Sequence, residues 1–391
     1  MRTLIELYDE RPLENVLGPE VFRPERVVYV CSPRVYKDRG LHRGLEDYFA
    51  HRGLELSLEF VKADVYRAEA ILNTLRQVVR SHPDCAMDIT GGTDAVLYAA
   101  GMLGAESSVP TFTYSRRKNC FYEIHNASFA AGLPCRVVYA VEDCFRMAGG
   151  SMRPGRVDNS VLSAYLPEVE PFFRLYLKHR RDWVKIVGFL QRISQYSGEQ
   201  LPPLSVSGAY SVKGERGGMI DAPEEALREL RRLGFLTELS VDREQGVRLR
   251  FRDHQIRAWL RDVGSVLELY VYKCCVDLEL FDDVRLSAVV EWKGSGRPEP
   301  VSNELDVMCT RGVTPVFISC KTCEVKTEAL NELAILRDRF GGGIAKAAVV
   351  TAEPGGAPMR NRAAELGIQV IDLAELRAGR LGRRVKKMMK I

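Results

Sequence analysis

The sequence has no hydrophobic run near the roughly 20 residues that a helix needs to cross a bilayer, and no apolar signal core in its first residues. Glu6, Asp9, Glu10 and Arg11 place charges there instead. Its ten cysteines are scattered rather than gathered in the repeated Cys-x-x-Cys spacings of structural zinc sites. We therefore expect a soluble protein of the reducing cytoplasm, without disulfides, structural zinc or a membrane segment.

Net charge is also small, because 56 Lys and Arg face 52 Asp and Glu, which leaves +4. So mild an excess does not by itself indicate nucleic-acid binding. Basic side chains nevertheless gather in the tail 377–390, as Arg380, Arg383, Arg384, Lys386, Lys387 and Lys390. That cluster is typical of a solvated terminal helix or of a surface that meets nucleic acid. The length of 391 residues predicts two or three globular domains.

Short β-branched runs alternate with amphipathic helical patterns over the first 145 residues. The expected strands are 4–7, 27–31, 56–61, 86–90 and 137–141, and the expected helices are 41–51, 67–80 and 94–103. This alternation predicts an α/β fold with a largely parallel, Rossmann-like sheet, which binds ligands at the carboxyl ends of its strands. We place this domain at residues 1–150 and expect a linker or exposed loop at 151–156, where Gly, Pro, Ser and Arg dominate.

The rest of the chain predicts two further domains. In residues 151–255, helices at 183–195 and 223–233 precede two alternating strands, a winged-helix-like pattern that serves either DNA contact or packing and dimerisation. Residues 256–391 return to an α/β pattern around a central hairpin. The elements expected there are a long helix at 256–278, the hairpin at 304–321, helices at 327–339 and 359–366, and strands at 347–351 and 369–372.

The hairpin is expected to gather acidic residues and a lysine. Glu304 and Asp306 alternate with apolar neighbours and share one face of the first strand, while Ser319 and Lys321 share one face of the second. With a suitable register, Asp306 meets Lys321. Upstream, Glu268 interrupts an apolar helical stretch, so its carboxylate must be paired, metal-bound or at an edge.

Carboxylates that hold a hard divalent ion, beside a cation near the attacking water, are what phosphodiester hydrolysis requires. Any one of these residues is compatible with an ordinary surface charge, but their combination indicates a site. We therefore predict Glu268, Glu304, Asp306 and Lys321 as catalytic, with the three carboxylates as metal ligands. Lys321 is expected to stabilise the negative charge that develops on the phosphate.

The run Asn-Glu-Leu-Asp-Val at 303–307, followed by Val-Phe-Ile-Ser-Cys-Lys-Thr at 316–322, resembles the signature of PD-(D/E)xK nucleases. The segments 347–351 and 362–372 likewise resemble the closing elements of Mrr-like restriction endonucleases. One departure concerns the position two residues before the lysine, where the family has Glu and this chain has Ser319. The second carboxylate must then come from Glu304 or Glu268, with Glu324 as a further candidate, or the site is weakened.

A second motif lies where the strand that ends near residue 90 runs into a helix. The turn Thr90-Gly91-Gly92-Thr93 lets backbone amides approach a phosphate, and the helix N-terminus adds its positive dipole. A glycine turn of this kind is also often purely structural, and the Gly-x-Gly-x-x-Gly fingerprint is absent. The turn is thus a candidate anion site.

In this position the Thr-Gly-Gly-Thr turn resembles the CARF sensor domain, which binds cyclic oligoadenylates in type III CRISPR defence. The segment 9–15 resembles the corresponding CARF loop. The ligand contacts that this resemblance implies are Arg11, Asn15, Ser32, Thr90, Gly91, Gly92 and Thr93. The basic turn 115–118 is a further candidate for phosphate contact, or else a solvated loop.

The resemblance covers nearly the whole chain, as a Rossmann-like CARF sensor domain, a winged-helix-like middle and a C-terminal restriction-endonuclease-like α/β domain. This is the order found in CRISPR ancillary nucleases activated by cyclic tetra-adenylate. It implies a homodimer with the ligand on its two-fold axis, and a nuclease that uses Mn²⁺ or Mg²⁺ on DNA, single-stranded RNA or both. Ligand binding would then shift the dimer towards an active arrangement.

Two other functions remain open on the sequence. One is a CARF winged-helix transcriptional regulator with a degenerate nuclease domain, which Ser319 favours. The other is a modification-dependent restriction enzyme that needs no nucleotide activator. The regulator would not cleave nucleic acid, which distinguishes it from a nuclease. The restriction enzyme would cleave equally with and without cyclic oligoadenylate, which distinguishes it from a ligand-activated nuclease.

Overall fold

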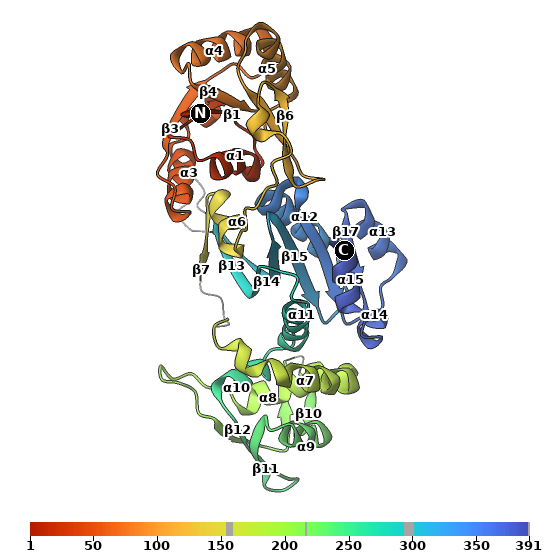
Figure 1. Cartoon of the computed structure of the whole chain (residues 1–391). Coiled ribbons are helices and arrows are strands. Elements are labelled where there is room, and N and C mark those ends of the chain that lie inside the picture. The colour runs from red at the N-terminus through yellow and green to blue at the C-terminus, as the bar shows by residue number, and fades with distance from the viewer. Residues whose placement is uncertain (154–158, 216, 293–300, 390–391) are drawn as a thin grey trace.

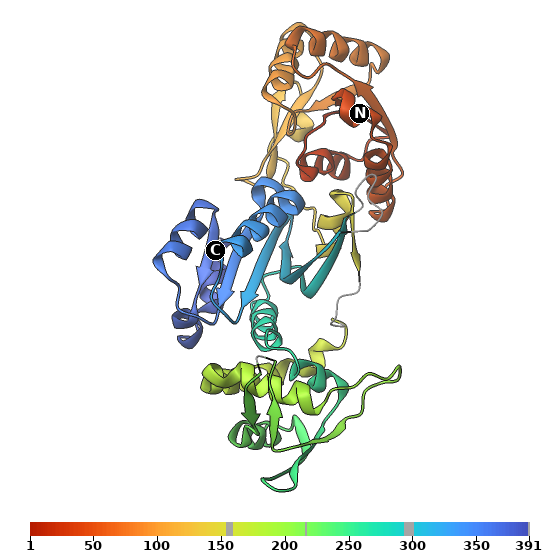
Figure 2. The ribbon, with the colours of Figure 1, turned by 180° about the vertical axis from the view of Figure 1, so that it is seen from behind.

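The computed structural model describes residues 1–153, 159–215, 217–292 and 301–389. Its three parts follow one another along an elongated molecule, and the C-terminal sheet lies between the N-terminal part and the middle stretch of the chain (Figures 1 and 2). The order in space therefore differs from the order in sequence. Among the described residues, no helix is both long and apolar enough to cross a membrane.

The N-terminal part is a six-stranded sheet of order β3-β2-β1-β4-β5-β6, parallel except for β6. Its strands are β1 (Thr3–Leu7), β2 (Arg26–Cys31), β3 (Ser57–Lys62), β4 (Cys85–Asp88), β5 (Thr111–Ser115) and β6 (Cys120–His125). Its helices are η1 (Pro12–Asn15), α1 (Leu17–Phe22), α2 (Pro33–Lys37), α3 (Arg39–His51), α4 (Ala68–Ser81), α5 (Asp94–Glu106) and η2 (Ser128–Ala130). Apolar residues of α4 and α5 cover one face, and those of α1 and α3 cover the other. The expected parallel sheet with helices on both faces is confirmed.

The expected strand at 137–141 is wrong. This segment is not paired in a sheet, and α6 (Val141–Met147) begins at its end. Its backbone crosses to the central part instead, because Tyr139 N donates to Gly312 O at 3.0 Å and Val141 N donates to Asp283 Oδ2 at 2.9 Å. The apolar run thus connects the N-terminal part to the central sheet.

The central part is a mixed six-stranded sheet of order β17-β16-β15-β14-β13-β7. Its strands are β7 (Gly150–Arg153), β13 (Asp283–Trp292), β14 (Val301–Arg311), β15 (Thr314–Lys321), β16 (Lys346–Thr351) and β17 (Ile368–Ile371). Its helices are α11 (Ser265–Asp277), α12 (Thr327–Gly341), η5 (Gly342–Ile344), α13 (Ala357–Glu365), α14 (Leu373–Arg377) and α15 (Leu381–Met388). The expected hairpin is confirmed as β14 and β15, which pair antiparallel. Helices α11 and α15 pack on one face, and α6, α12 and α13 pack on the other.

Two expectations fail at the borders of this sheet. Residues 151–153 of the expected linker form part of the edge strand β7, which pairs with β13, while 154–156 lie outside the described residues. The expected long helix at 256–278 is two helices, α10 (His254–Trp259) and α11. The break is stabilised by Asp262, whose Oδ1 accepts hydrogen bonds of 2.8 Å from the N–H groups of Gly264 and Ser265.

The middle stretch of the chain forms the lower part of the molecule in Figure 1. Its helices are η3 (Leu162–Tyr165), α7 (Leu166–His179), η4 (Arg180–Asp182), α8 (Trp183–Ile193) and α9 (Glu224–Arg232). Its strands are β8 (Ser205–Gly208), β9 (Ser211–Lys213), β10 (Met219–Asp221), β11 (Leu236–Asp242) and β12 (Gly246–Phe251). The expected helices and strand pair are present, and β8 adds a third strand beside β12. Whether this shape contacts DNA stays a prediction.

One hydrophobic core runs from the underside of the N-terminal sheet into the central sheet. It includes Tyr29 and Tyr48 of the first part and Phe317 of β15. Between them, Phe145 of α6 packs edge-on against Phe340 of α12, with ring centroids 5.1 Å apart. This shared core holds the two parts in one relative position, whereas the division at residues 150 and 255 stays a prediction.

Candidate active site

Asp306 and Lys321 meet where β14 and β15 adjoin. Lys321 Nζ lies 3.6 Å from Asp306 Oδ2, so the expectation that these side chains meet is confirmed. The same oxygen accepts hydrogen bonds from Ser319 Oγ at 3.1 Å and from Cys320 N at 2.6 Å. Three donors from β15 therefore hold the Asp306 carboxylate in one orientation. Burial raises the pKa of Asp306, and Lys321 and the two hydrogen bonds oppose that rise.

Glu268 faces this pair from the first turns of α11. Burial, followed by repulsion from Asp306, Asp262 and Glu304, raises the pKa of Glu268 to about 8. The position depends on Gly264, where a Cβ atom would lie only 2.7 Å from Glu268 Oε1. The residue that interrupts an apolar helix thus lies near the predicted site, as expected.

The Glu304 side chain is directed towards β13. It is exposed, and Ser287 of β13 donates a hydrogen bond to its Oε1. Ser287 itself is buried and has φ +55° in the middle of a strand, which is uncommon for a residue other than glycine. The third predicted carboxylate is therefore turned towards the neighbouring strand, although its charge still raises the pKa of Glu268.

The placement of these carboxylates fits a divalent cation electrostatically but not as a finished ligand set. Carboxylates crowded in a partly buried site repel one another, and a cation there relieves that repulsion. Among the described residues, only His179, Glu225 and Glu229 bring three ligand atoms within 4.8 Å of one another, and they belong to the middle part. Lys178 donates to both of those glutamates, 2.6 Å from Glu225, so an ion-pair network already occupies that cluster.

Sequence reasoning missed several residues around the site. Asp262 and Ser287 gave no signal, because each acts through a helix start or an unusual backbone angle. The expectation that the cysteines form no Cys-x-x-Cys pair is wrong, because Cys320 and Cys323 have that spacing around Lys321. Cys320 is buried, Cys323 is exposed and both are free thiols. Glu324 is exposed just beyond β15, and its role stays a prediction.

The sensor turn, residues 90–93, lies at the carboxyl end of β4, next to the loop that follows β1. Gly92 has φ +100°, and a Cβ atom on Gly91 would lie 2.8 Å from Leu7 O, so the turn itself requires both glycines. Thr90 Oγ1 accepts a hydrogen bond of 2.8 Å from Tyr114 N, and Thr93 precedes α5. The turn is thus built against the sheet, with α5 directed away from it.

Asp9, which the sequence did not single out, organises the adjoining loop. Its carboxylate accepts from Gly92 N at 3.0 Å and from Arg11 Nε at 3.0 Å. Asn15 is buried, and its side chain bonds the backbone of Asp9 at 2.8 and 2.7 Å. Arg11 is therefore coupled to the sensor turn, whereas Asn15 holds the shape of the loop. Their roles as ligand contacts stay predictions.

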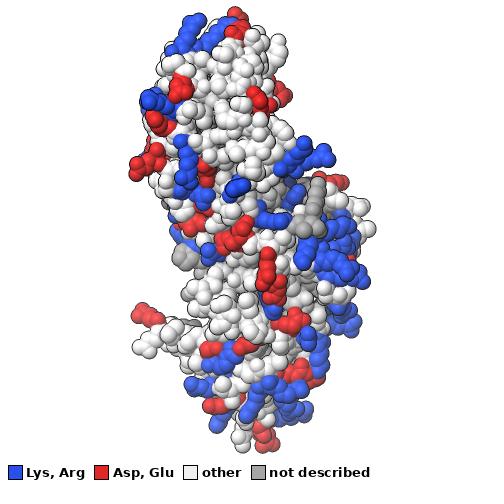
Figure 3. Space-filling view, in the orientation of Figure 1, with Lys and Arg blue, Asp and Glu red and all other residues white. Residues whose placement is uncertain are grey.

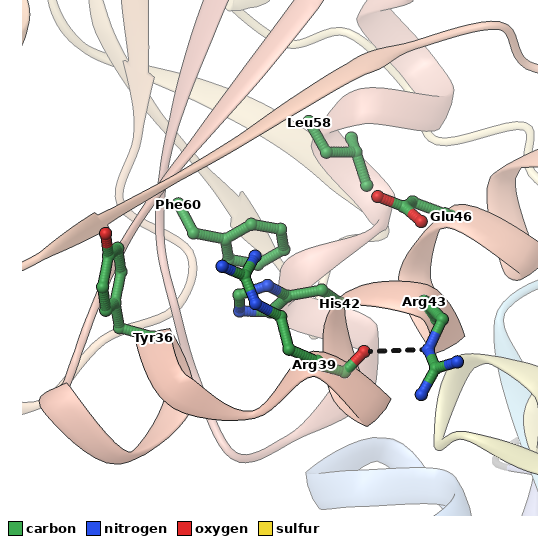
Figure 4. A pocket seen from close by; sticks show the side chains of 7 residues that line it. All are labelled: Tyr36, Arg39, His42, Arg43, Glu46, Leu58 and Phe60. Carbon is green, nitrogen blue, oxygen red and sulfur yellow. Dashed lines mark hydrogen bonds between the residues drawn. The ribbon is translucent and has the colours of Figure 1, made fainter.

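Ser32 caps α2 by accepting from Val35 N at 3.3 Å. Beyond α2, between α3 and β3, lies a pocket of about 320 Å³ (Figure 4). The residues that line it are Tyr36, Arg39, His42, Arg43, Glu46, Leu58 and Phe60. The His42 ring stacks on Phe60 at a centroid distance of 3.6 Å, which fills the floor of the pocket. Two arginines and an exposed tyrosine thus remain at the rim.

Basic side chains gather beside α13, on the side of the central sheet away from β7 (Figure 3). Residues 381–388 of the basic tail form α15, whose Leu381 and Val385 are buried against the core. The exposed basic residues of this tail are Arg377, Arg380, Arg383, Lys386 and Lys387, and Lys390 lies outside the described residues. The tail is therefore a packed helix with a basic outer face.

Comparison with known proteins supports this organisation. Residues 253–390 match the family model of the Card1-like endonuclease domain. The crystal structure of protein VC1899 from Vibrio cholerae shares the fold at a TM-score of 0.73 and 17% identity, over 99% of this chain and 98% of that chain. Can2 from Sulfobacillus thermosulfidooxidans, in complex with cyclic tetra-adenylate, gives 0.69 and 15% over 99% of each chain. Curated protein sequences gave no match.

The two kinds of likeness agree. The family model covers the segment that holds Glu268, Asp306 and Lys321, and the structural matches extend the shared fold over the N-terminal and middle parts. Residues 253–390 are thus similar to Card1-like endonuclease domains, as the sequence led us to expect, and the chain as a whole shares the fold of Can2.

Proposed function

We propose that this protein is a metal-dependent nuclease of type III CRISPR defence that cyclic tetra-adenylate activates. The observation that carries the proposal is the contact between Asp306 and Lys321, with Glu268 beside it, inside the segment similar to Card1-like endonuclease domains. A carboxylate held by two hydrogen bonds, with a lysine 3.6 Å away, suits phosphodiester hydrolysis better than a structural ion pair alone.

In this proposal Asp306 and Glu268 would hold Mn²⁺ or Mg²⁺, and Glu304, now bonded to Ser287, would be the further candidate ligand. The cation would polarise the phosphate and lower the pKa of a bound water. Lys321 stabilises negative charge on the phosphate oxygens. Ser319 takes the place of the second acidic residue of the PD-(D/E)xK signature and donates to Asp306. It orients the remaining carboxylate but supplies no charge for the metal.

The substrate class follows from charge. The basic residues beside α13 and on α15 offer a surface for a phosphate backbone next to the sheet that carries the site. We propose DNA, single-stranded RNA or both as substrates.

Activation is proposed from the sensor end. The sensor turn, Arg11 and Ser32 lie at the carboxyl edge of a sheet with the order 3-2-1-4-5-6, where such sheets bind nucleotides. Can2, which shares the fold, binds cyclic tetra-adenylate. We propose that this chain binds the same ligand across a homodimer axis, and that it works in the cytoplasm, which its ten free cysteines suit.

The decisive experiment measures cleavage of plasmid DNA and of single-stranded RNA with Mn²⁺, with and without cyclic tetra-adenylate. Asp306→Ala and Lys321→Ala are each expected to reduce ligand-dependent cleavage by about 10²–10³-fold. The exposed Glu244→Ala and Lys213→Ala serve as controls of matched charge and are expected to cleave normally. Equal cleavage by all four variants would contradict the site assignment.

Ser319 also favours a second function, a transcriptional regulator with an inactive nuclease domain. That function predicts sequence-specific DNA binding and no cleavage with any metal. A ligand-independent restriction enzyme predicts equal cleavage with and without cyclic tetra-adenylate. The same assay therefore separates all three.

A further inference from the structure

The loop between β1 and α1 contacts both the sensor turn and the central part of the molecule. On the sensor side, a Cβ atom added to Gly91 would lie 3.0 Å from Asp9 Cβ and 3.2 Å from Glu14 Cβ. Gly92 N also donates to Asp9 Oδ2 at 3.0 Å. The sensor turn therefore rests directly on this loop, and a displacement of one must displace the other.

Glu14 lies at the centre of a charged group that we call the junction cluster, which consists of Arg11, Glu14 and Arg116. The side chain of Glu14 is only 1% exposed. It forms ion pairs with Arg116 and with Arg11 Nε, the latter at 3.5 Å. A buried carboxylate of this kind depends on both arginines for its charge balance. The turn at 115–118 was expected either to bind phosphate or to be solvated. In the structure its Arg116 side chain points inward and pairs with Glu14.

The two arginines contact the central part at what we call the triple-glycine turn, residues 341–343. A Cβ atom on Gly343 would lie 2.8 Å from Arg116 Nη1, and one on Gly342 would lie 3.7 Å from Arg11 Cβ. A side chain on Gly343 would press into the junction cluster, and one on Gly342 would touch it at an ordinary van der Waals distance. The absence of side chains on this turn allows the arginines of the sensor to approach its backbone.

The triple-glycine turn also adjoins the strand that carries the active site. A Cβ atom on Gly341 would lie 2.8 Å from Pro315 Cγ and 3.0 Å from Phe317 Cε2, both in β15. Ser319 and Lys321 follow on the same strand. A continuous line of contacts therefore joins the sensor turn to the residues that hold Asp306.

We propose that the junction cluster transmits ligand binding at the sensor turn through the triple-glycine turn to β15. This inference rests on the proposed function and assigns its regulation to named positioning residues. The side chains of Arg11 and Arg116 are 41% and 30% exposed, so an anionic phosphate at the turn competes with Glu14 for them. When the two arginines are displaced, their contacts with the triple-glycine turn change. The turn then shifts, and β15, which packs against it, shifts as well.

Two variants test the two sides of this contact. Glu14→Gln removes the charge that pairs with both arginines, while Asp9 still pairs with Arg11, and it keeps the shape of the side chain. Gly343→Ala inserts a methyl group against the flexible end of Arg116, which can turn aside without unfolding the domain. Each is expected to reduce the activation of cleavage by cyclic tetra-adenylate at least about tenfold. Gly218→Ala, which meets nothing within 4 Å, is the matched control and is expected to match the wild type.

Ligand binding is measured in parallel, as the rise in melting temperature that cyclic tetra-adenylate causes. We expect both variants to keep that rise, and the double variant to lose less activation than the two single losses multiplied together. Normal activation in both single variants overturns the inference, as does loss of activation that merely follows loss of binding. A wild type that neither binds nor responds to the ligand overturns the proposed function instead.

Discussion

The N-terminal sheet and the central sheet both hold largely buried acidic side chains, but the Glu6–Asp88 pair of the first has no cationic partner among the described residues, whereas Asp306 of the second has one. At the sensor end, Glu6 of β1 and Asp88 of β4 are adjacent in the sheet and almost fully buried. Neither oxygen of Glu6 has a hydrogen-bond partner among the described residues. At the candidate active site, Asp306 has Lys321 at 3.6 Å and two hydrogen-bond donors.

The two sites differ in whether their carboxyl groups are stable in the charged form. Burial, and then repulsion from Asp88, raise the pKa of Glu6, and burial raises the pKa of Asp88 to about 7. These two groups are best satisfied by protons, in a closed space beside Gly18 that admits no side chain. Asp306 is 17% exposed and oriented by donors, so solvent reaches it. A buried acid pair by itself therefore does not indicate a metal site.

The first way to sharpen this comparison is to remove the two remaining candidate ligands separately. Glu268→Gln is expected to raise the Mn²⁺ concentration needed for half-maximal cleavage by about 10–100-fold, because the charge of Asp306 already raises the pKa of Glu268. Glu304→Gln is expected to have the smaller effect, since its carboxylate is directed to Ser287. A manganese titration of cleavage measures both. The reverse order would make Glu304 the second ligand and Glu268 a structural acid.

The second prediction concerns the closed pair and its pH dependence. The pKa of Asp88 is raised in the folded state, so its contribution to stability is full below the unfolded pKa and is lost as pH rises through about 7. The melting temperature of the wild type should therefore fall between pH 5 and pH 8. Asp88→Asn removes one titrating group and keeps an acceptor for Thr90 N, so we expect a gain of about 2–4 °C at pH 8.

That measurement needs a control from another part of the molecule. Glu244→Gln changes an exposed acid in the turn between β11 and β12, and it should leave the melting curve parallel to the wild type at every pH. An Asp88→Asn variant as pH-sensitive as the wild type would show that the pair does not hold an extra proton.

Much of the fold was predictable from periodicity. The alternating runs predicted the parallel sheet, and the polar-apolar alternation of 304–308 and 316–321 predicted the β14–β15 hairpin and the contact of Asp306 with Lys321. The errors lie where a long-range partner decides. An apolar run at 137–141 is not a strand because its backbone bonds to Gly312 and Asp283, and residues 151–153 pair with β13 far along the chain.

The site was predictable in type but not in detail. The alternation placed Glu304 and Asp306 on one strand face, yet only the structure shows Glu304 bonded to a buried serine with positive φ. In the N-terminal part, the Thr-Gly-Gly-Thr motif identified Thr90 and Gly91 from the sequence. The residue that links this turn to the next loop is Asp9, whose role depends on the distance to Gly92. Single side chains that bridge two loops leave no periodic signal in a sequence.

The smallest expected effect tests how far Ser319 compensates for the missing acid. Ser319→Ala removes one of the three donors to Asp306 Oδ2 but leaves Lys321 and Cys320 N in place. A hydrogen bond worth about 1 kcal/mol corresponds to about a fivefold loss of cleavage rate at saturating Mn²⁺. Ser319→Thr keeps the hydroxyl group and should retain most of the activity. If the alanine variant cleaves as fast as the wild type, Lys321 and the backbone amide alone orient Asp306, and the hydroxyl group of Ser319 is dispensable.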